Sequence, residues 1–288
     1  MTLEIGLGCA TLLSLGLPEL IEVAARHGFP TITARPLSFV QALDDGFTEP
    51  GLRRKLADAG VRVSMVDCLN KGLPGIPPLA SIDPTMRSRL PPDALNPPDQ
   101  ETVMRSAEAL EAPWVNVSHF LGHVVPFEEM AEAIGNTCRR AAASGLGIAL
   151  EFNPDTGLPD MGYAQRIAEA CGEANCKITL DFWHLDRCGG DVADIGALPP
   201  SALAGLQLSD CWRPAPGAAY VPMSGRDLPG EGELPLGELV VAALANSPGI
   251  CAEVEVFSSE LQAMTPDQAA ARVASALASW RTLTRAPE

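Results

Sequence analysis

ITLDFWHLD, residues 178–186, is the stretch of sequence that best indicates the fold. Residues 178–180 are apolar or β-branched and predict a short buried strand. Asp181 and His184, two side chains able to bind a metal, follow that strand directly. In α/β proteins the carboxyl ends of parallel strands open onto the ligand-binding face, so the stretch predicts an α/β fold with its site there. The alternative is that Asp181 caps a following helix and His184 is a partly buried loop residue.

Strand and helix patterns alternate along the whole chain. The predicted strands are residues 3–7, 30–35, 61–69, 114–119, 146–151, 178–180, 204–208 and 250–256. The predicted helices are residues 18–28, 50–59, 99–110, 127–144, 162–171, 191–198, 236–245 and 266–283. Eight strand-then-helix units in one chain of 288 residues favour a single (β/α)8 TIM barrel over an open α/β sheet.

The stretch 70–98 interrupts this alternation and holds many of the prolines of the chain. Proline at this density disfavours a helix or a central strand. Long irregular loops inside compact domains are usually lids or binding loops, so we expect a cover over the active site, with a linker as the alternative. Residues 1–288 then form one TIM-barrel domain with a Pro-rich lid loop at about 70–98.

Composition narrows the class of partner. Lys+Arg 20 against Asp+Glu 36 gives a net charge of −16 and a pI near 4.6. That charge argues against a nucleic acid or an anionic membrane as partner and favours a small-molecule substrate. The hydrophobic fraction of 47% is compatible with a homo-oligomer.

The cysteines and the N-terminal residues indicate the compartment. The eight cysteines show no CxxC spacing, so they predict neither a zinc knuckle nor a disulfide framework. We expect reduced thiols in a cytoplasmic protein. The first residues lack the basic region of a secretory signal, and no apolar run approaches the roughly 20 residues of a membrane span.

Polar side chains occupy the predicted carboxyl ends of the strands, where a barrel brings them to one mouth: Arg35, Asp67, His119, Glu151, Asp181, Gln207 and Glu255. Several buried carboxylates need a cation among them. Oxygen ligands with one amide or imidazole suit Mn²⁺, Mg²⁺ or Co²⁺ better than a thiolate-type zinc site, with Zn²⁺ as a further candidate. Glu255 lies nearer the carboxyl end than Glu253 and is the expected ligand of the two. Arg35 and His119 are candidate substrate contacts.

Five motifs carry a resemblance to a known family. The chain resembles the xylose-isomerase-like TIM barrels, the sugar phosphate isomerase/epimerase superfamily, at LEFNP (150–154), LDFWHLD (180–186), LQLSD (206–210), RDLPGEGELPL (226–236) and VEVFSSEL (254–261). The motifs cover the second half of the chain. The first half is similar only in its alternation of strands and helices.

The resemblance implies a set of site residues. It makes Glu151, Asp181 and Glu255 metal-binding carboxylates and lets His184 contact the substrate beside the metal. Gln207 stands at the fourth ligand position, which is usually a histidine in the ketose epimerases, whereas 3-dehydroshikimate dehydratase-like enzymes use glutamine there. Arg226 matches an arginine that holds substrate oxygens; the alternative is a surface loop residue.

These residues predict a divalent-metal-dependent isomerase or epimerase that acts on a sugar-like ketose or a cyclic polyol ketone. Glu151 and Glu255 are the expected catalytic pair, one removing a proton next to the carbonyl and the other returning it. The first alternative is a metal-dependent dehydratase or lyase, of the 3-dehydroshikimate or inosose dehydratase type, with His184 or His119 as the acid. The second is a barrel subunit without catalytic activity.

Two further classes are disfavoured by residue type. The only lysines are Lys55, Lys71 and Lys177, and none lies at the end of a predicted strand, which argues against a Schiff-base aldolase. The endonuclease branch of the superfamily would need a histidine-rich zinc cluster and a basic face. The chain has four histidines and a net charge of −16.

Overall fold

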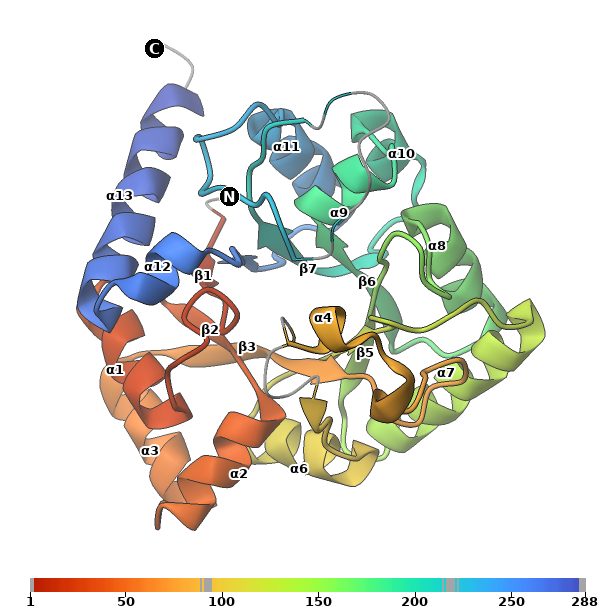
Figure 1. Cartoon of the computed structure of the whole chain (residues 1–288), viewed down its shortest axis with the longest axis horizontal. Coiled ribbons are helices and arrows are strands. Elements are labelled where there is room, and N and C mark those ends of the chain that lie inside the picture. Colours follow the sequence, from red (N-terminus) through yellow and green to blue (C-terminus); the bar gives the residue numbers. More distant parts are fainter. Residues whose placement is uncertain are drawn as a thin grey trace.

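The computed structural model describes residues 3–88, 90, 95–213, 215, 221 and 223–284. Its strands pair in parallel and close into a barrel in the order β1-β2-β3-β4-β5-β6-β7-β8. Helices surround this barrel on the outside (Figure 1). The predicted (β/α)8 TIM barrel is confirmed. None of the described helices combines the length and the apolar character that a membrane span requires.

Each strand overlaps the stretch predicted for it. The strands are β1 (Ile5–Leu7), β2 (Thr31–Ala34), β3 (Arg62–Leu69), β4 (Trp114–Ser118), β5 (Gly147–Glu151), β6 (Cys176–Asp181), β7 (Leu203–Leu208) and β8 (Ala252–Val254). The register pairs Asp181 with Gln207, and Gln207 in turn with Glu253. Polar side chains of three neighbouring strands therefore lie at similar heights in the barrel.

The helices follow the predicted pattern with three additions. The helices are α1 (Leu17–Arg26), α2 (Pro36–Asp44), α3 (Glu49–Ala59), α6 (Gln100–Ala109), α7 (Phe127–Ala142), α8 (Met161–Ala170), α9 (Phe182–Arg187), α10 (Val192–Ala197), α11 (Leu236–Asn246), α12 (Ser259–Ala263) and α13 (Pro266–Thr284). Helices α2 and α12 were not predicted, and α9 was predicted only by the alternative in which Asp181 caps a following helix. Helix α3 shows how local signals set an end, because Thr48 caps its first turn and Gly60, at φ 65°, ends it.

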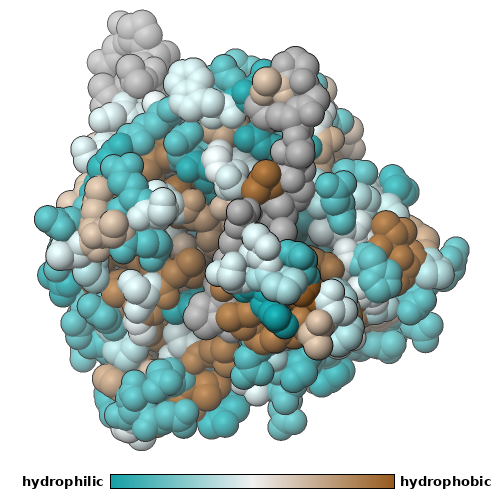
Figure 2. Space-filling view, viewed as in Figure 1, coloured by the Kyte–Doolittle hydropathy of each residue, from teal (hydrophilic) through white to brown (hydrophobic). Residues whose placement is uncertain are grey.

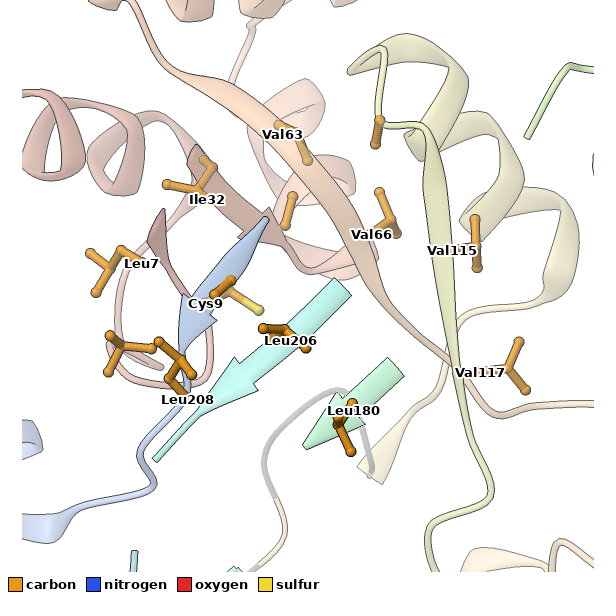
Figure 3. Packing of buried hydrophobic residues seen from close by; sticks show 14 of the residues in the cluster. Leu7, Cys9, Ile32, Val63, Val66, Val115, Val117, Leu180, Leu206 and Leu208 are labelled. Atoms are coloured by element: carbon orange, nitrogen blue, oxygen red, sulfur yellow. The ribbon is translucent and has the colours of Figure 1, made fainter. Parts of the chain in front are cut away.

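The apolar core lies between the strands and the surrounding helices. Leu206 and Leu208 of β7 are buried and alternate with the polar Gln207, as the period of a strand requires. Figure 3 shows these leucines with the apolar side chains of the neighbouring strands. One face of each strand therefore supplies the core, and the other face lines the lumen, where the polar residues collect.

The loop between β3 and α6 contains two short helical turns, η1 (Leu79–Ser81) and α4 (Pro84–Arg87). The expectation that its prolines exclude helix was wrong here, because Pro84 stands at the first position of α4, where a missing N–H costs nothing. In Figure 1 this segment crosses the centre of the barrel. Pro91 and Pro92, part of the predicted lid, lie outside the described residues.

Candidate active site

Asp181 ends β6 and is fully buried at the mouth of the barrel. Its Oδ1 accepts hydrogen bonds from the backbone N–H groups of Trp183 (2.7 Å) and His184 (3.1 Å), so it caps α9. Its Oδ2 lies 2.6 Å from Nη1 of Arg226. The alternative that Asp181 caps a following helix is therefore confirmed for one oxygen, while the other oxygen faces Arg226 and its role as a metal ligand stays a prediction.

Arg226 lies at the centre of the site with only 5% of its surface exposed. Besides Asp181, its Nη1 lies 3.4 Å from Oε2 of Glu255, and its Nη2 lies 3.2 Å from Nε2 of His184. The guanidinium also stacks over the ring of Trp183, 4.8 Å from the ring centroid. These contacts exclude the alternative that Arg226 is a surface loop residue.

Asp210 holds the loop that carries Arg226. Its carboxylate accepts backbone hydrogen bonds from Cys211 (2.8 Å), Gly230 (3.0 Å) and Leu234 (3.0 Å). A side chain at Gly232 would place its Cβ 2.4 Å from Oδ1 of Asp210, so the loop can close around the carboxylate only with glycine there. The PGEG sequence was recognised as a turn, but its anchor on Asp210 was not predicted.

Glu151, at the end of β5, is oriented by a residue that the sequence analysis missed. Its Oε2 accepts a hydrogen bond of 2.7 Å from Nδ2 of Asn116, and the same Nδ2 donates to Oδ1 of Asp67 (2.8 Å). Oδ1 of Asn116 accepts from the hydroxyl of Thr179 (2.7 Å). The signal was present, because Asn116 is the one amide within the apolar strand WVNVS. Oε1 of Glu151 lies 3.3 Å from Nε2 of His184.

The buried charges at the mouth are predominantly negative. Burial opposes the ionisation of Asp181, but the charges of Arg226 and His184 outweigh it and hold the pKa of Asp181 below its usual range. Burial also raises the pKa of Glu255 well above its usual value; Arg226 opposes this rise, and the carboxylates of Asp67 and Glu151 add to it. One guanidinium and one imidazole thus face four carboxylates.

Gln207 is buried at the same level, with 3% of its surface exposed. Its Oε1 has no hydrogen-bond partner among the described residues. A buried carbonyl oxygen without a partner is costly unless a ligand or ion completes it. Carboxylate oxygens of Glu151 and Asp181 and a ring nitrogen of His184 lie within 4.8 Å of one another. The donor set therefore fits a divalent cation with oxygen ligands.

A pocket opens above these residues and is lined by Glu151, His184, Arg226 and Glu255. Arg35 lies on its wall, and its Nη2 donates to the carbonyls of Leu13 (2.9 Å) and Leu15 (3.1 Å). The remaining lining is mainly apolar. It includes the lid residues Ile76, Pro77, Leu79 and Ile82, and Phe120 and Phe257 from outside the lid. Apolar side chains also gather near the middle of the face seen in Figure 2. The predicted lid therefore contributes directly to the pocket.

His119 does not line this pocket. It is fully buried, and its Nδ1 accepts from the backbone N–H of Gly157 (2.9 Å), so the proton lies on Nε2, which donates to the carbonyl of Pro74 (2.7 Å). Burial lowers its pKa and favours this neutral ring. A Cβ at Gly122 would lie 2.1 Å from the ring, which shows how closely the loops pack around it. A substrate contact by His119 stays a prediction, and it would require one of these hydrogen bonds to break.

Comparison with known proteins agrees with this geometry. The chain matches the family described as xylose isomerase-like TIM barrel over residues 21–282. The protein therefore belongs to the xylose isomerase-like TIM barrel family. A search of curated proteins finds no match.

Solved structures share the fold at low sequence identity. The IOLI protein, crystallised with a bound zinc atom, is 16% identical with a TM-score of 0.80, over 99% of this chain and 100% of the other. D-psicose 3-epimerase, crystallised in the presence of D-fructose, is 15% identical with a TM-score of 0.70, over 98% and 99%. The probable 3-DHS dehydratase AsbF from Bacillus anthracis is 16% identical with a TM-score of 0.69, over 96% and 98%. At these identities the similarity establishes the fold.

Proposed function

We propose that the protein is a divalent-metal-dependent isomerase or epimerase that acts on a sugar-like ketose or a cyclic polyol ketone. The observation that carries the proposal is the excess of buried carboxylates at the mouth, where Glu151 and Glu255 line an apolar pocket, together with the unpartnered carbonyl of Gln207, which pairs with Asp181 in the register of the strands. A further cation would share the carboxylate charges and so stabilise this arrangement. Two structural relatives are consistent with this proposal: the IOLI protein, crystallised with a bound zinc atom, and D-psicose 3-epimerase.

Glu151, Asp181, Gln207 and Glu255 would hold the metal, with Mn²⁺, Mg²⁺ or Co²⁺ preferred by their oxygen atoms and Zn²⁺ as a further candidate. When bound, a divalent ion polarises a substrate carbonyl and makes the neighbouring C–H more acidic. Gln207 would supply a carbonyl oxygen as ligand. Because this side chain is neutral, it adds no titratable group to the site.

Four side chains would have separate roles in the proposed reaction. Glu151 and Glu255 both line the pocket and come from different strands, so one can take a proton from the substrate carbon and the other can return it. Return to the same carbon from the other side gives epimerisation, and return to the neighbouring carbon gives isomerisation. Arg226 and His184, which also line the pocket, would bind substrate oxygens. The apolar lid excludes water from the proton transfer.

A dehydratase or lyase is the second candidate, because Gln207 occupies the position that resembles 3-dehydroshikimate dehydratase-like enzymes. The structural relative AsbF carries a corresponding name. In this reaction the same carboxylate removes the proton, and an acid protonates the departing group. His184 is the better candidate for the acid, since it lines the pocket and its Nδ1 has no partner among the described residues, whereas both nitrogens of His119 are engaged.

The test is metal-dependent exchange of substrate protons. The protein is stripped with chelator and reloaded with Mn²⁺, Mg²⁺, Co²⁺ or Zn²⁺, and NMR follows solvent deuterium entering a panel of ketoses, inososes and dehydroshikimate. We expect exchange at a carbon next to the carbonyl, reduced by about 10²- to 10⁴-fold in Glu151→Gln and Glu255→Gln. Glu253→Gln, two residues from Glu255 and one layer deeper, is the matched control and should retain exchange.

The outcome also separates the candidates. An epimer or isomer as product supports the first proposal, and an unsaturated product supports the dehydratase. A protein that binds no divalent metal and exchanges no proton would overturn both, and would favour the barrel as a subunit without catalytic activity.

A further inference from the structure

Three cysteines far apart in the sequence meet on the outer wall of the barrel, away from the candidate active site. Cys138 lies in α7, Cys171 directly follows α8, and Cys176 begins β6. Their three sulfur atoms all lie within 4.8 Å of one another. The spacing in sequence is 33 and 5 residues, which matches no simple motif, so only the fold brings these thiols together.

The backbone around the cluster is fixed by hydrogen bonds. The side-chain amide of Asn175 donates to the carbonyls of Cys138 and Leu146, both at 2.9 Å, and so ties the loop before β6 to α7. The N–H of Cys176 donates to the carbonyl of Glu173 (3.1 Å). Because all three elements are held, the sulfur positions are set by the fold and do not depend on a flexible loop.

Gly135 brings the two helices close enough for the cluster to form. A Cβ at Gly135 would lie 3.3 Å from the carbonyl oxygen of Cys171 and 3.6 Å from its Cβ. Such close contact leaves little room for a larger side chain in α7 at this point. The end of α8 therefore approaches the backbone of α7 one turn before Cys138.

We propose that Cys138, Cys171 and Cys176 form a binding site for a thiophilic d¹⁰ metal ion, with Zn²⁺ as its representative. Zinc–thiolate bonds of about 2.3 Å place three sulfur atoms about 4 Å apart, so shifts of less than about 1 Å convert the observed cluster into three ligands. Thiolates select such soft ions over Mg²⁺ and Mn²⁺. The fourth position of a tetrahedral ion would be filled by water.

Access and charge both fit an ion at this place. Cys138 is fully buried, Cys171 has 9% of its surface exposed, and Cys176 is partly exposed. An ion can therefore reach the cluster from the solvent. The guanidinium of Arg139, paired with Glu173 at 2.7 Å, lies beside the cluster. A positive neighbour of this kind offsets part of the negative charge that three thiolates leave on one zinc ion.

The thiol of Cys171 donates a hydrogen bond to the carbonyl of Ala168 (3.2 Å), which fixes its sulfur beside the other two. Zn²⁺ binding would replace three thiol protons with three zinc–sulfur bonds and release the three protons to solvent, so that atoms and charge balance.

The test uses the reduced full-length protein and Co²⁺ as a probe for the Zn²⁺ position. Thiolate ligands give Co²⁺ an intense ligand-to-metal absorption in the near ultraviolet, which the oxygen ligands at the barrel mouth do not give. We expect this absorption in the wild type, its loss on addition of Zn²⁺, and at least tenfold weaker binding in Cys171→Ser and Cys176→Ser.

Two control variants separate this cluster from other thiols. Cys68→Ser changes a thiol in the lining of the active-site pocket, and Cys251→Ser changes a partly exposed thiol at the start of β8; both should keep the absorption. Circular dichroism checks that each variant is folded. Independently, Zn²⁺ should protect Cys171 and Cys176 from alkylation in the wild type, as measured by mass spectrometry of peptides.

The proposal fails if the wild type shows no thiolate absorption, or if Cys68→Ser removes it while Cys171→Ser does not. It also fails if mild oxidation joins two of the three thiols by a disulfide and no Co²⁺ binds to the reduced form. In that case two of the cysteines form a redox-active pair and the third is a neighbouring thiol. None of these outcomes depends on activity at the barrel mouth, so this proposal can fail while the proposed function stands.

Discussion

Glu255 and Glu253 lie two residues apart near the end of the chain. Both are buried and burial raises the pKa of both, but their partners differ. Glu255, at the mouth, lies 3.4 Å from the guanidinium of Arg226 and close to three other carboxylates. Glu253, one layer deeper, receives a hydrogen bond of 3.2 Å from the hydroxyl of Thr31, and Ser64 and the charge of Arg62 also favour its charged form.

The difference shows two ways in which one fold accommodates buried acids. At the mouth, burial and neighbouring carboxylates raise the pKa of Glu255, while the guanidinium of Arg226 favours its charged form. In the deeper layer burial raises the pKa of Glu253 to about 7, so the carboxyl is half-neutralised near neutral pH. Four measurements test this contrast, from the largest expected effect to the smallest.

The strongest test removes the guanidinium from the mouth. Arg226→Gln leaves Asp181 and Glu255 buried without their cation and should lower the free energy of unfolding of the chelator-treated protein by about 4 kcal/mol. Urea denaturation gives the value. The matched control is Arg105→Gln, which breaks the exposed pair with Glu49 and should cost less than about 1 kcal/mol. Equal losses of stability in the two variants would show that the buried ion pairs at the mouth contribute no more than an exposed pair.

The second test adds a cation to the mouth. Mn²⁺ at about 100 times its dissociation constant should raise the free energy of unfolding of the wild type by about 2.7 kcal/mol. The gain should vanish in Glu255→Gln and persist in Glu253→Gln, because only the first residue is a proposed ligand. Thermal unfolding with and without the metal measures the difference. A gain that survives in both variants would place the ion elsewhere.

The third test addresses the deeper layer through pH. The native pKa of Glu253, about 7, lies above its unfolded value near 4.5, so between these pH values the native state holds a proton that the unfolded state has released. The resulting stability is complete below pH 4.5 and is lost as the pH rises through about 7. Glu253→Gln keeps a neutral side chain at all pH values. It should therefore match the wild type at pH 5 and exceed it by about 2 kcal/mol at pH 8.

Denaturation curves at several pH values read out this effect. Parallel pH profiles for the wild type and Glu253→Gln would mean that Glu253 ionises normally in the fold, and the two layers would then differ less than their contacts indicate.

The smallest test removes the hydroxyl beside Glu253. Thr31→Val deletes the hydrogen bond of 3.2 Å to Oε1 and should cost about 1 kcal/mol. Because that bond favours the charged carboxylate, its loss should also raise the pKa of Glu253 further. An NMR titration of the Glu253 side chain measures the shift. An unchanged or lower pKa would show that Thr31 does not act on the charged form.

The sequence predicted the barrel because its signals are local and repeated. Each strand needs only a few apolar residues and each helix only its own periodicity, and eight repeats leave few alternatives. Glu151, Asp181 and Glu255 could be placed at the mouth for the same reason, since they stand at strand ends. Helix α9 was only an alternative at the level of sequence, because its first residues, Phe182 and Trp183, look like a continuation of the apolar strand.

The inward position of Arg226 and the meeting of the three cysteines depend on contacts between distant residues. Arg226 faces the site because Asp210, sixteen residues earlier, fixes the loop from within. Cys138 meets Cys171 because α7 and α8 pack closely at Gly135. Neither relation leaves a regular spacing in the chain, so pattern recognition alone does not reveal it.

The anchoring of the lid has a practical consequence for engineering. The lid leaves the barrel at Asn70, whose side chain donates to the carbonyls of Ser118 (2.9 Å) and Phe120 (3.1 Å), and it is fastened again where Pro74 meets the buried His119. It returns at Asp99, which caps α6. Since the segment begins at a hydrogen-bonded residue and ends at a helix cap, we expect insertions between these two points to cost little, because loop-closure entropy grows only slowly with length. Libraries confined to this segment would vary the apolar wall of the pocket while leaving the carboxylates beneath it undisturbed.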